Sequence, residues 1–260
     1  MNLQGRVVLI TGASEGIGAA CARELAGRGA KLVLLARSEK VAEVARETGG
    51  EAVRGDVTLA EARQEFVDRA VQVHQRVDVL VNNAGVGIYG PSHRASMAEM
   101  RAMFEVNLFA ALEMVQLVAP VMKQQRDGMI VNISSIAGLV PLPWFTMYSA
   151  AKYAVMAMTD GQRMELAGYN VRTMAVCPGY VRTRFQDNVL SGRPPERLWR
   201  NRRFAITAEE CAQATARGIE KESRTVVTPG VGRVLVAARA LAPRVVDHFL
   251  RKIYADLDIA

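Results

Sequence analysis

The chain has few of the residues that form disulfides or bind metal ions. Its 260 residues include three cysteines and three histidines. Cys21, Cys177 and Cys211 lie far apart and form no C-x-x-C pair. The pattern therefore predicts neither a disulfide framework nor a zinc site, and it is typical of a reducing cytoplasm. The histidines are scattered as well, so we expect no metal.

The chain also lacks a segment typical of a signal peptide or a membrane span. Its first residues, MNLQGR, lead into a short apolar run that has no cleavage site. Residues 128–151 carry no charge, but Asn132, Ser134, Pro141 and Pro143 fall among them. They are therefore expected to form a strand and a loop, and we expect a cytoplasmic protein.

Acidic residues are outnumbered by basic ones, which gives a formal net charge of +7. Such a charge is compatible with nucleic acid, an anionic membrane or an acidic substrate. A general preference for arginine would also explain it without any function. Aromatic and basic residues are not interleaved as in nucleic-acid-binding motifs, so we expect no nucleic-acid partner.

Short apolar runs alternate with helical stretches along most of the chain. Strands are predicted at residues 6–11, 31–36, 52–53, 77–82, 129–134, 171–177 and 225–228. Helices are predicted at residues 16–28, 39–47, 59–74, 97–125 with a bend at Pro120, 146–166 and 208–221. This alternation predicts an α/β fold with a doubly wound parallel sheet of seven strands. No linker or repeat interrupts it, so we expect a single Rossmann domain over residues 1–260.

A glycine-rich turn joins the first predicted strand to the first helix. It contains Gly12, Ser14, Glu15, Gly16, Ile17 and Gly18. Glycines in this place permit a tight turn and a close approach of backbone to a pyrophosphate, which then lies on the helix N-terminus. The alternative is that the glycines serve only the packing of helix on strand.

The end of the second strand indicates which nicotinamide cofactor is used. No carboxylate stands there to hold a free ribose hydroxyl, and Arg37 is placed to bind a 2′-phosphate. NADP(H) is therefore favoured, and NAD stays possible, because Arg37 can also be a solvated helix-start residue and Glu15 brings a negative charge nearby. Asp56, followed by Val57, can accept a hydrogen bond from adenine or simply cap a turn.

Tyr148 and Lys152 are four residues apart on a predicted helix, so their side chains share one face. A lysine ammonium beside a phenol is expected to lower its pKa from about 10. Ser135 stands upstream at a strand end. Tyr-x-x-x-Lys alone is a poor signal, but together with Ser135 and the glycine turn it points to proton transfer at a bound cofactor.

Six motifs in order resemble the short-chain dehydrogenase/reductase family over roughly residues 3–228. They are Gly12-x-x-x-Gly16-x-Gly18, Asn82-Asn83-Ala84-Gly85, Asn107 in FEVN, Ser134 to Gly138, Tyr148 to Lys152, and Pro178 to Thr183. Each motif is short, but their shared order on the expected elements makes the resemblance specific.

The resemblance implies a role for each catalytic residue. Tyr148 would act as general acid or base, and Lys152 would lower its pKa and hold the nicotinamide ribose. Ser135, at the family's spacing of thirteen residues before the tyrosine, would bind the substrate carbonyl in place of Ser134. Asn107 would hold a water in a proton relay, or it is only an asparagine at a helix bend.

The resemblance also implies further cofactor contacts and an assembly. Asn83, Ala84 and Gly85 would line the cofactor channel. Val181 and Thr183 would fix the carboxamide end of the cofactor, and Pro178 and Gly179 would also bind it. The family usually forms homodimers or homotetramers through the helices that correspond to residues 97–125 and 146–166.

Apolar residues near these motifs suggest a bulky, apolar small-molecule substrate, and the alternative is that they serve ordinary core packing. They are Ile88, Tyr89, the segment PLPWF from Pro141 to Phe145, and, in the expected substrate lid at about residues 182–206, Phe185, Leu190, Leu198, Trp199 and Phe204. The lid is also basic, with Arg182, Arg184, Arg193, Arg197, Arg200, Arg202 and Arg203. A solvated face is favoured for these arginines over an anionic ligand such as an acyl-thioester carrier.

The C-terminal tail, about residues 230–260, predicts two helical halves separated near Pro243. Val245, Val246, Phe249, Leu250 and Ile253 recur at helical spacing. Family members that reduce acyl-carrier-protein thioesters usually end in a glycine-rich turn and a short strand instead. This tail is more similar to those of relatives acting on steroids, retinoids, lipid ketones or aldehydes. Docking on its own domain or a subunit is favoured over peripheral membrane contact.

Together these patterns predict an NADP(H)-preferring oxidoreductase that interconverts a carbonyl and an alcohol on an apolar, lipid- or steroid-like substrate. The alternatives are a 3-oxoacyl-thioester reductase and a non-catalytic NADP-binding sensor or scaffold. Family members of the last kind typically lose the tyrosine or lysine, and this chain keeps both.

Overall fold

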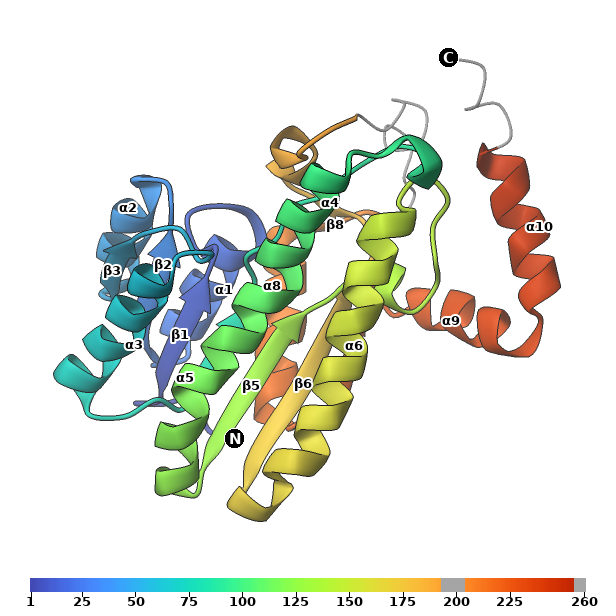
Figure 1. The fold of residues 1–260 in the computed structure, drawn as a ribbon. Helices are drawn as coiled ribbons and strands as arrows, with labels where there is room; N and C mark the ends of the chain where they lie inside the picture. The colour runs from blue at the N-terminus through green and yellow to red at the C-terminus, as the bar shows by residue number, and fades with distance from the viewer. Residues whose placement is uncertain (193–203, 255–260) are drawn as a thin grey trace.

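Seven parallel strands form one sheet in the computed structural model, which describes residues 1–192 and 204–254 (Figure 1). Their order is β3-β2-β1-β4-β5-β6-β9. The strands are β1 (Val7–Thr11), β2 (Lys31–Ala36), β3 (Glu51–Arg54), β4 (Val79–Asn82), β5 (Gly128–Ile133), β6 (Val171–Pro178) and β9 (Thr225–Thr228). The predicted doubly wound sheet is confirmed. The strand order reverses between β1 and β4, and a crevice is expected at that point.

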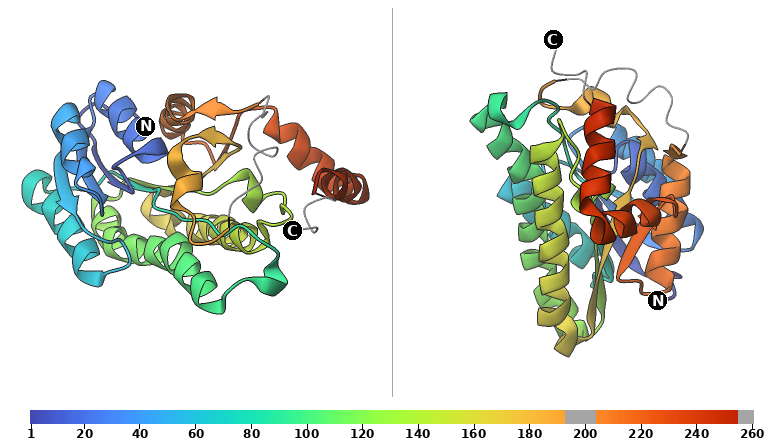
Figure 2. Two further views of the ribbon diagram at one scale, coloured as in Figure 1. Left: turned by 90° about the horizontal axis from the view of Figure 1, so that it is seen from above. Right: turned by 90° about the vertical axis from the view of Figure 1, so that its right-hand side faces the viewer.

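Helices cover both faces of the sheet (Figure 2). One face carries α1 (Gly16–Gly27), α2 (Lys40–Thr48) and α8 (Ala208–Glu220). The other carries α3 (Ala60–His74), α5 (Ala110–Gln125) and α6 (Thr146–Leu166). Because both faces are covered, the strands are apolar along their whole length and not alternately polar.

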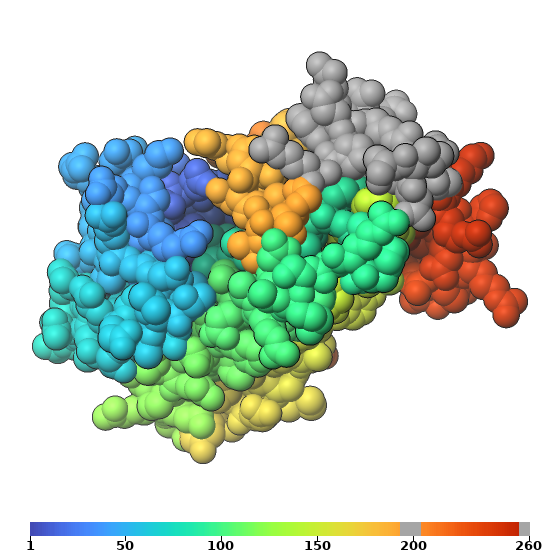
Figure 3. Space-filling model, turned by 45° about the horizontal axis from the view of Figure 1, so that its top comes forward, coloured from blue at the N-terminus to red at the C-terminus, as the bar shows by residue number. Residues whose placement is uncertain are grey.

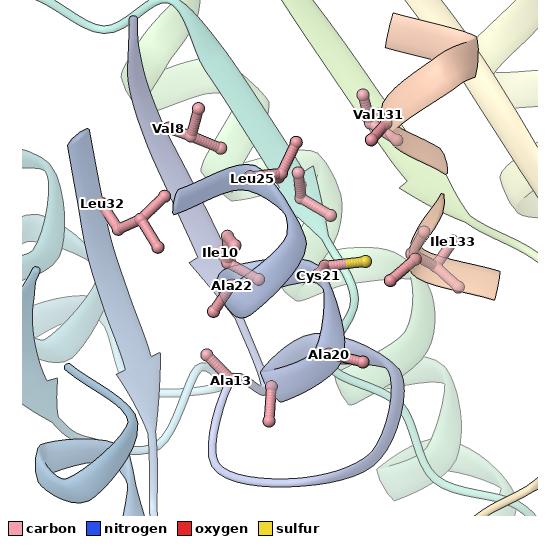
Figure 4. Close-up of a cluster of buried hydrophobic side chains, with 14 of the residues drawn as sticks. Val8, Ile10, Ala13, Ala20, Cys21, Ala22, Leu25, Leu32, Val131 and Ile133 are labelled. Carbon is pink, nitrogen blue, oxygen red and sulfur yellow. The ribbon is translucent and has the colours of Figure 1, made fainter. Parts of the chain in front are cut away.

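The core is divided between these two layers by the alternation of side chains along each strand. Val8 and Ile10 of β1 pack toward α1, while Val7 and Leu9 pack on the opposite face. In Figure 4 the small residues Cys21 and Ala22 of α1 lie in the same cluster as Ile10 of β1. Small side chains let the helix lie close to the sheet, which brings its N-terminus to the carboxyl edge of β1.

The predicted helix over residues 97–125 is divided into three parts. α4 (Met97–Phe104) is followed by a π-helical turn, η2 (Glu105–Phe109), and then by α5. The irregular turn lies at Asn107, whose amide bonds the backbone of Val86, and not at Pro120, which lies inside α5. By length and composition residues 97–125 are apolar enough to cross a membrane. Their buried side chains, Met114 and Val118 among them, pack on the sheet, so they form a core helix.

A short parallel pair, β7 (Val181–Arg182) with β8 (Ile206–Thr207), was not predicted. It ties together the two ends of the expected lid. Between the strands lies the short helix η5 (Arg184–Asn188). Several lid residues lie outside the described part of the chain: Arg193, Arg197, Leu198, Trp199, Arg200, Arg202 and Arg203.

The tail forms two helices, α9 (Gly232–Leu241) and α10 (Pro243–Tyr254), which divide at the predicted proline. Val246 and Leu250 of α10 are buried in a small cluster with Val140. In Figure 1, α10 stands at the edge of the molecule, and its C-terminal end lies toward the carboxyl edge of the sheet.

Candidate active site

A cleft of about 620 Å³ opens at the carboxyl edge of the sheet, over the reversal point between β1 and β4. Most residues that the motifs nominate line this cleft. They are Gly12, Ser14, Glu15, Gly16, Ile17, Arg37, Asp56, Val57, Asn83, Ala84, Gly85, Ser135, Tyr148, Lys152, Pro178, Gly179, Val181 and Thr183. Gly18 and Asn107 do not line it. Segments far apart in the sequence thus share one cavity, which reaches from the glycine turn to Tyr148.

The turn before α1 needs glycine at three positions. Gly12 and Gly16 have φ of +66° and +57°, which disfavour a side chain. A Cβ at Gly18 would lie 2.2 Å from the carbonyl oxygen of Gly12. The lack of a side chain at Gly18 therefore permits its close approach to the Gly12 carbonyl group in this turn. Glu15, the N-cap residue, makes no side-chain cap, and the first turn of α1 carries no acid. Its amides can therefore receive an anion, and the site fits a dinucleotide pyrophosphate.

Asn83 braces this turn from the neighbouring strand end. Its side-chain amide donates to the carbonyl oxygens of Thr11 and Gly12, both at 3.0 Å. The hydroxyl of Thr11 in turn accepts from the backbone N–H groups of Asn83 and Ala84, at 3.0 and 3.1 Å. The motifs after β1 and β4 therefore form one rigid floor under the cleft.

Arg37 and Asp56 stand together at the far end of the cleft. The Arg37 guanidinium is exposed, and its Nη1 lies 3.8 Å from Asp56 Oδ2. The other carboxylate oxygen of Asp56 accepts from the backbone N–H and the hydroxyl of Thr58, at 2.9 and 2.8 Å. Asp56 is thus fixed in a turn, and Arg37 keeps most of its donors for a ligand.

Glu15 points toward the segment that follows β7. Its Oε1 accepts from Asn188 Nδ2 at 2.7 Å. On that side, Gly16 lies against Thr183: a Cβ at Gly16 would be 3.5 Å from the Thr183 methyl group. The glycine turn and the start of the expected lid therefore meet across the cleft.

The two adjacent serines have different surroundings. Ser134 is buried, and its hydroxyl donates to the carbonyl oxygen of Lys152 at 3.1 Å. Ser135 accepts from the N–H of Ala137 at 3.1 Å and also hydrogen-bonds the hydroxyl of Tyr148. Of the two, Ser135 therefore has its hydroxyl beside the Tyr148 phenol.

Tyr148 has a raised pKa, contrary to the expected lowering by Lys152. Burial raises the pKa of Tyr148 to about 12, and the hydrogen bond with Ser135 opposes this shift. The Lys152 Nζ lies 5.7 Å from the centre of the tyrosine ring. It donates to the carbonyl oxygen of Ile133 at 2.9 Å, so it is held back from the phenol. The phenol is therefore protonated at neutral pH.

Lys152 is buried, and burial lowers its pKa to about 8. Asn107 is buried nearby, outside the cleft lining. Its amide accepts from the N–H and donates to the carbonyl of Val86, both at 2.8 Å. A Cβ at Gly85 would lie 3.0 Å from Asn107 Oδ1 and 3.6 Å from Lys152 Nζ. Asn107 thus fixes the loop after β4, which packs against the lysine at Gly85.

Aromatic rings surround Tyr148. Its ring centre lies 5.7 Å from that of Phe145 and 5.8 Å from that of Phe185. Behind Phe145, Tyr89 lies 4.8 Å away and stacks on Trp144 at 5.9 Å. Of the apolar residues expected at the substrate, Leu142, Phe145 and Phe185 line the cleft, whereas Tyr89 and Trp144 support them from behind.

Several cleft residues were not predicted. They include Ser38, Tyr180, Gln186, Asn188 and Tyr254. Tyr254 comes from the tail, nearly at the end of the described chain. Its spacing of four residues from Leu250, and eight from Val246, places it on the inward stripe of α10, and this was the signal available in the sequence.

The chain is similar to known dehydrogenases over most of its length. The family model described as short chain dehydrogenase matches residues 6–194. A curated relative, Ketoacyl reductase HetN of Nostoc sp., is 32% identical over 269 aligned residues, covering 96% of this chain and 90% of the relative.

Solved structures share the fold. A short chain dehydrogenase/reductase from Burkholderia phymatum in complex with NAD has a TM-score of 0.85 at 28% identity, with 94% of this chain and 96% of that chain covered. A short chain dehydrogenase from Burkholderia cenocepacia J2315 in complex with NADP has a TM-score of 0.80 at 30% identity, with 96% and 99% covered. One holds NAD and the other NADP, so both cofactors occur on this architecture.

Proposed function

This chain belongs to the short-chain dehydrogenase/reductase family of NAD(P)-dependent oxidoreductases that act on CH–OH groups, and from that premise we propose that it prefers NADP(H) and interconverts a ketone or aldehyde with its alcohol on an apolar substrate. The observation that carries this proposal is the joining of Ser135 and Tyr148 to the glycine turn within one cleft.

The proposed roles follow from the protonation states of the side chains. Tyr148, with its pKa at about 12, holds a proton for the developing alkoxide during reduction. Ser135 donates a hydrogen bond to the same oxygen. Lys152, mostly charged at neutral pH, stabilises the phenolate that remains. The bound nicotinamide supplies or accepts the hydride.

The NADP(H) preference is supported by the exposed Arg37 guanidinium beside Ser38 at the end of β2. An arginine binds a phosphate with two parallel hydrogen bonds, whereas an acidic residue would be needed there to favour NAD. Arg37→Ser should therefore raise the KM for NADPH about tenfold or more and leave the KM for NADH nearly unchanged.

An apolar substrate is supported by the walls around Tyr148. Phe145, Phe185 and Leu142 line the cleft, and Tyr254 closes one side of it. Planar or hydrocarbon groups gain free energy by contact with such walls.

A 3-oxoacyl-thioester substrate is the second candidate. It is supported by the similarity of nearly the whole chain to Ketoacyl reductase HetN, and by Arg184 in the cleft lining. Against it stands the helical ending, α9 and α10, in place of a glycine-rich turn and a strand.

A cytoplasmic location is inferred from the cysteines. Cys21, Cys177 and Cys211 are free and buried, as expected of thiols that need no oxidising compartment.

The decisive experiment is NADPH oxidation, with NADH in parallel, against lipophilic ketones, aldehydes, steroid ketones and one 3-oxoacyl thioester. Turnover of lipophilic carbonyls with NADPH supports the proposal. Turnover of the thioester alone would assign the second candidate. Equal rates with NADH would refute the preference assigned to Arg37.

Tyr148→Phe is the matched variant for the proton-transfer step. It keeps the ring contacts with Phe145 and Phe185 and removes only the hydroxyl. We expect kcat to fall by about 10²–10⁴-fold, with the Kd for NADPH, measured by fluorescence, within about threefold of the parent value. Retained turnover would contradict the role of Tyr148.

A further inference from the structure

The tail helix α10 carries two apolar stripes, and only one of them is buried. Val246 and Leu250 face inward, against Val140. Val245 and Phe249, on the neighbouring stripe, are 68% and 58% exposed, and Ile253 continues that stripe. Within the described residues, packing therefore covers one of the two apolar stripes of this helix.

Exposed apolar side chains also stand on α9 and at its end. Leu241, at the corner between the two helices, is 86% exposed, and Val234 is 68% exposed. Figure 3 shows α9 and α10 together at one side of the molecule. Apolar side chains gathered on one face, unlike single scattered ones, indicate an interaction surface.

A basic stripe borders the exposed apolar one. Arg244, His248 and Lys252 recur every fourth residue, one position from Val245, Phe249 and Ile253. All three are exposed. Within residues 1–192 and 204–254, neither Arg244, Arg251 nor Lys252 has a carboxylate partner, whereas Arg239 pairs with Asp247.

This charge pattern favours an anionic membrane over a second copy of the chain as the partner. Two copies of the chain meeting through this face would bring like charges together, which opposes self-association. A helix with apolar residues beside unpaired lysine and arginine is suited to the boundary between anionic headgroups and acyl chains. Each such cation contributes about 1 kcal/mol near an anionic surface.

We propose that the face formed by Val234, Leu241, Val245, Phe249 and Ile253, with Arg244 and Lys252, docks on an anionic lipid bilayer. The same helix brings Tyr254 into the lining of the cleft. Docking would therefore place the mouth of the cleft near the membrane surface, where an apolar substrate is concentrated.

The test is co-sedimentation of the full chain with vesicles of phosphatidylcholine alone or with phosphatidylserine added. We expect binding to the anionic vesicles, weakened by salt, and little binding to the neutral ones. Equal binding to both, or none to the anionic vesicles at low salt, would overturn the proposal.

Two double variants test the apolar stripe and the basic stripe separately. Val245→Ser with Phe249→Ser removes the apolar stripe, and Arg244→Glu with Lys252→Glu reverses the basic one. Each should lower the vesicle partition coefficient at least about tenfold. Leu59→Ser, at the 55% exposed N-cap of α3, is the matched control and should bind like the parent.

Light scattering separates the lipid from a second copy of the chain. If Val245→Ser with Phe249→Ser converts an oligomer to a smaller species, the face is a subunit interface and the proposal is wrong. NADPH binding by each variant, unchanged, shows that the fold is intact. Because the readout is vesicle binding, a failure here leaves the proposed activity untouched.

Discussion

At the scale of single residues, Gly18 affects the shape of the anion-binding turn although it does not line the cleft. A Cβ at this position would meet the Gly12 carbonyl oxygen at 2.2 Å, and this backbone group cannot move without distorting the anion-binding turn. Gly18→Ala should lower the free energy of unfolding by about 1–3 kcal/mol and raise the Kd for NADPH at least about tenfold. Urea unfolding and fluorescence titration measure the two effects.

Gly27→Ala is the matched control, since it lies in the same helix. An added Cβ there meets nothing within 4 Å. It should leave NADPH binding unchanged and stabilise the chain by at most about 1 kcal/mol. Equal behaviour of the two variants would show that the close approach of Gly18 to Gly12 is unimportant.

Lys152 predicts the pH dependence of reduction. Tyr148, with a pKa of about 12, stays protonated throughout the usual range. Burial lowers the pKa of Lys152 to about 8, so its charge is lost above that pH. We expect kcat/KM for reduction to fall as pH rises through about 8. A rate that stays constant to pH 9.5 would contradict this dependence on the ammonium.

The same pKa has the opposite effect on stability. The folded value lies below the ordinary 10.5, so the unfolded chain binds the proton more tightly between pH 8 and 10.5. This group's contribution to stability is complete above the unfolded pKa and is lost as pH falls through about 8. Unfolding driven by Lys152 therefore cannot explain a loss of activity at alkaline pH, and a thermal melt at each pH checks this.

At the scale of elements, α10 connects the tail to the active site. Leu250 is buried against Val140, and Tyr254, one turn further on, lines the cleft. Leu250→Ser should loosen this helix and raise the KM for an apolar substrate roughly tenfold, equivalent to about 1.4 kcal/mol. Because the cofactor side of the cleft is built by other elements, the Kd for NADPH should not change.

Val245→Ser is the control for that variant, because it makes the same kind of change on the exposed side of α10. It should leave KM at the parent value in a soluble assay. A similar rise in both variants would mean that the composition of the helix, and not its packing on Val140, affects the substrate.

The elements also show what sequence can and cannot predict. Periodicity is local, so every strand of the main sheet and the helices α1, α2, α3, α6 and α8 were predicted within a few residues. The π-helical turn at Asn107 depends on its bonds to Val86, and the β7–β8 pair joins residues 181 and 206. Neither contact leaves a local pattern in the sequence.

At the scale of the whole molecule, the site contains residues that local motifs predict and residues that only long-range packing brings in. Most of the residues carried by motifs, from Gly12 to Thr183, line one cleft, because strand order brings all carboxyl ends to one edge. Tyr254 and Asn188 enter the cleft through packing of the tail and of η5. The raised pKa of Tyr148 was missed because burial outweighs the influence of a lysine held by Ile133.

The outer surface of the helices over residues 97–125 and 146–166 is the expected site of subunit pairing. The resemblance implies pairing through residues 97–125 and 146–166, and exposed apolar side chains stand on these helices: Phe109, Tyr153 and Met164, the last 76% exposed. We expect a dimer or tetramer of the 28.3 kDa chain by light scattering. Met164→Glu should shift it to a smaller species, because a buried unpaired charge at an interface costs several kcal/mol.

Leu59→Glu tests whether any exposed apolar residue would act in the same way. Leu59 is 55% exposed beside α3, away from the helices expected to pair. Its replacement should leave the mass unchanged. A monomeric parent chain, or equal dissociation by both variants, would refute pairing through α5 and α6.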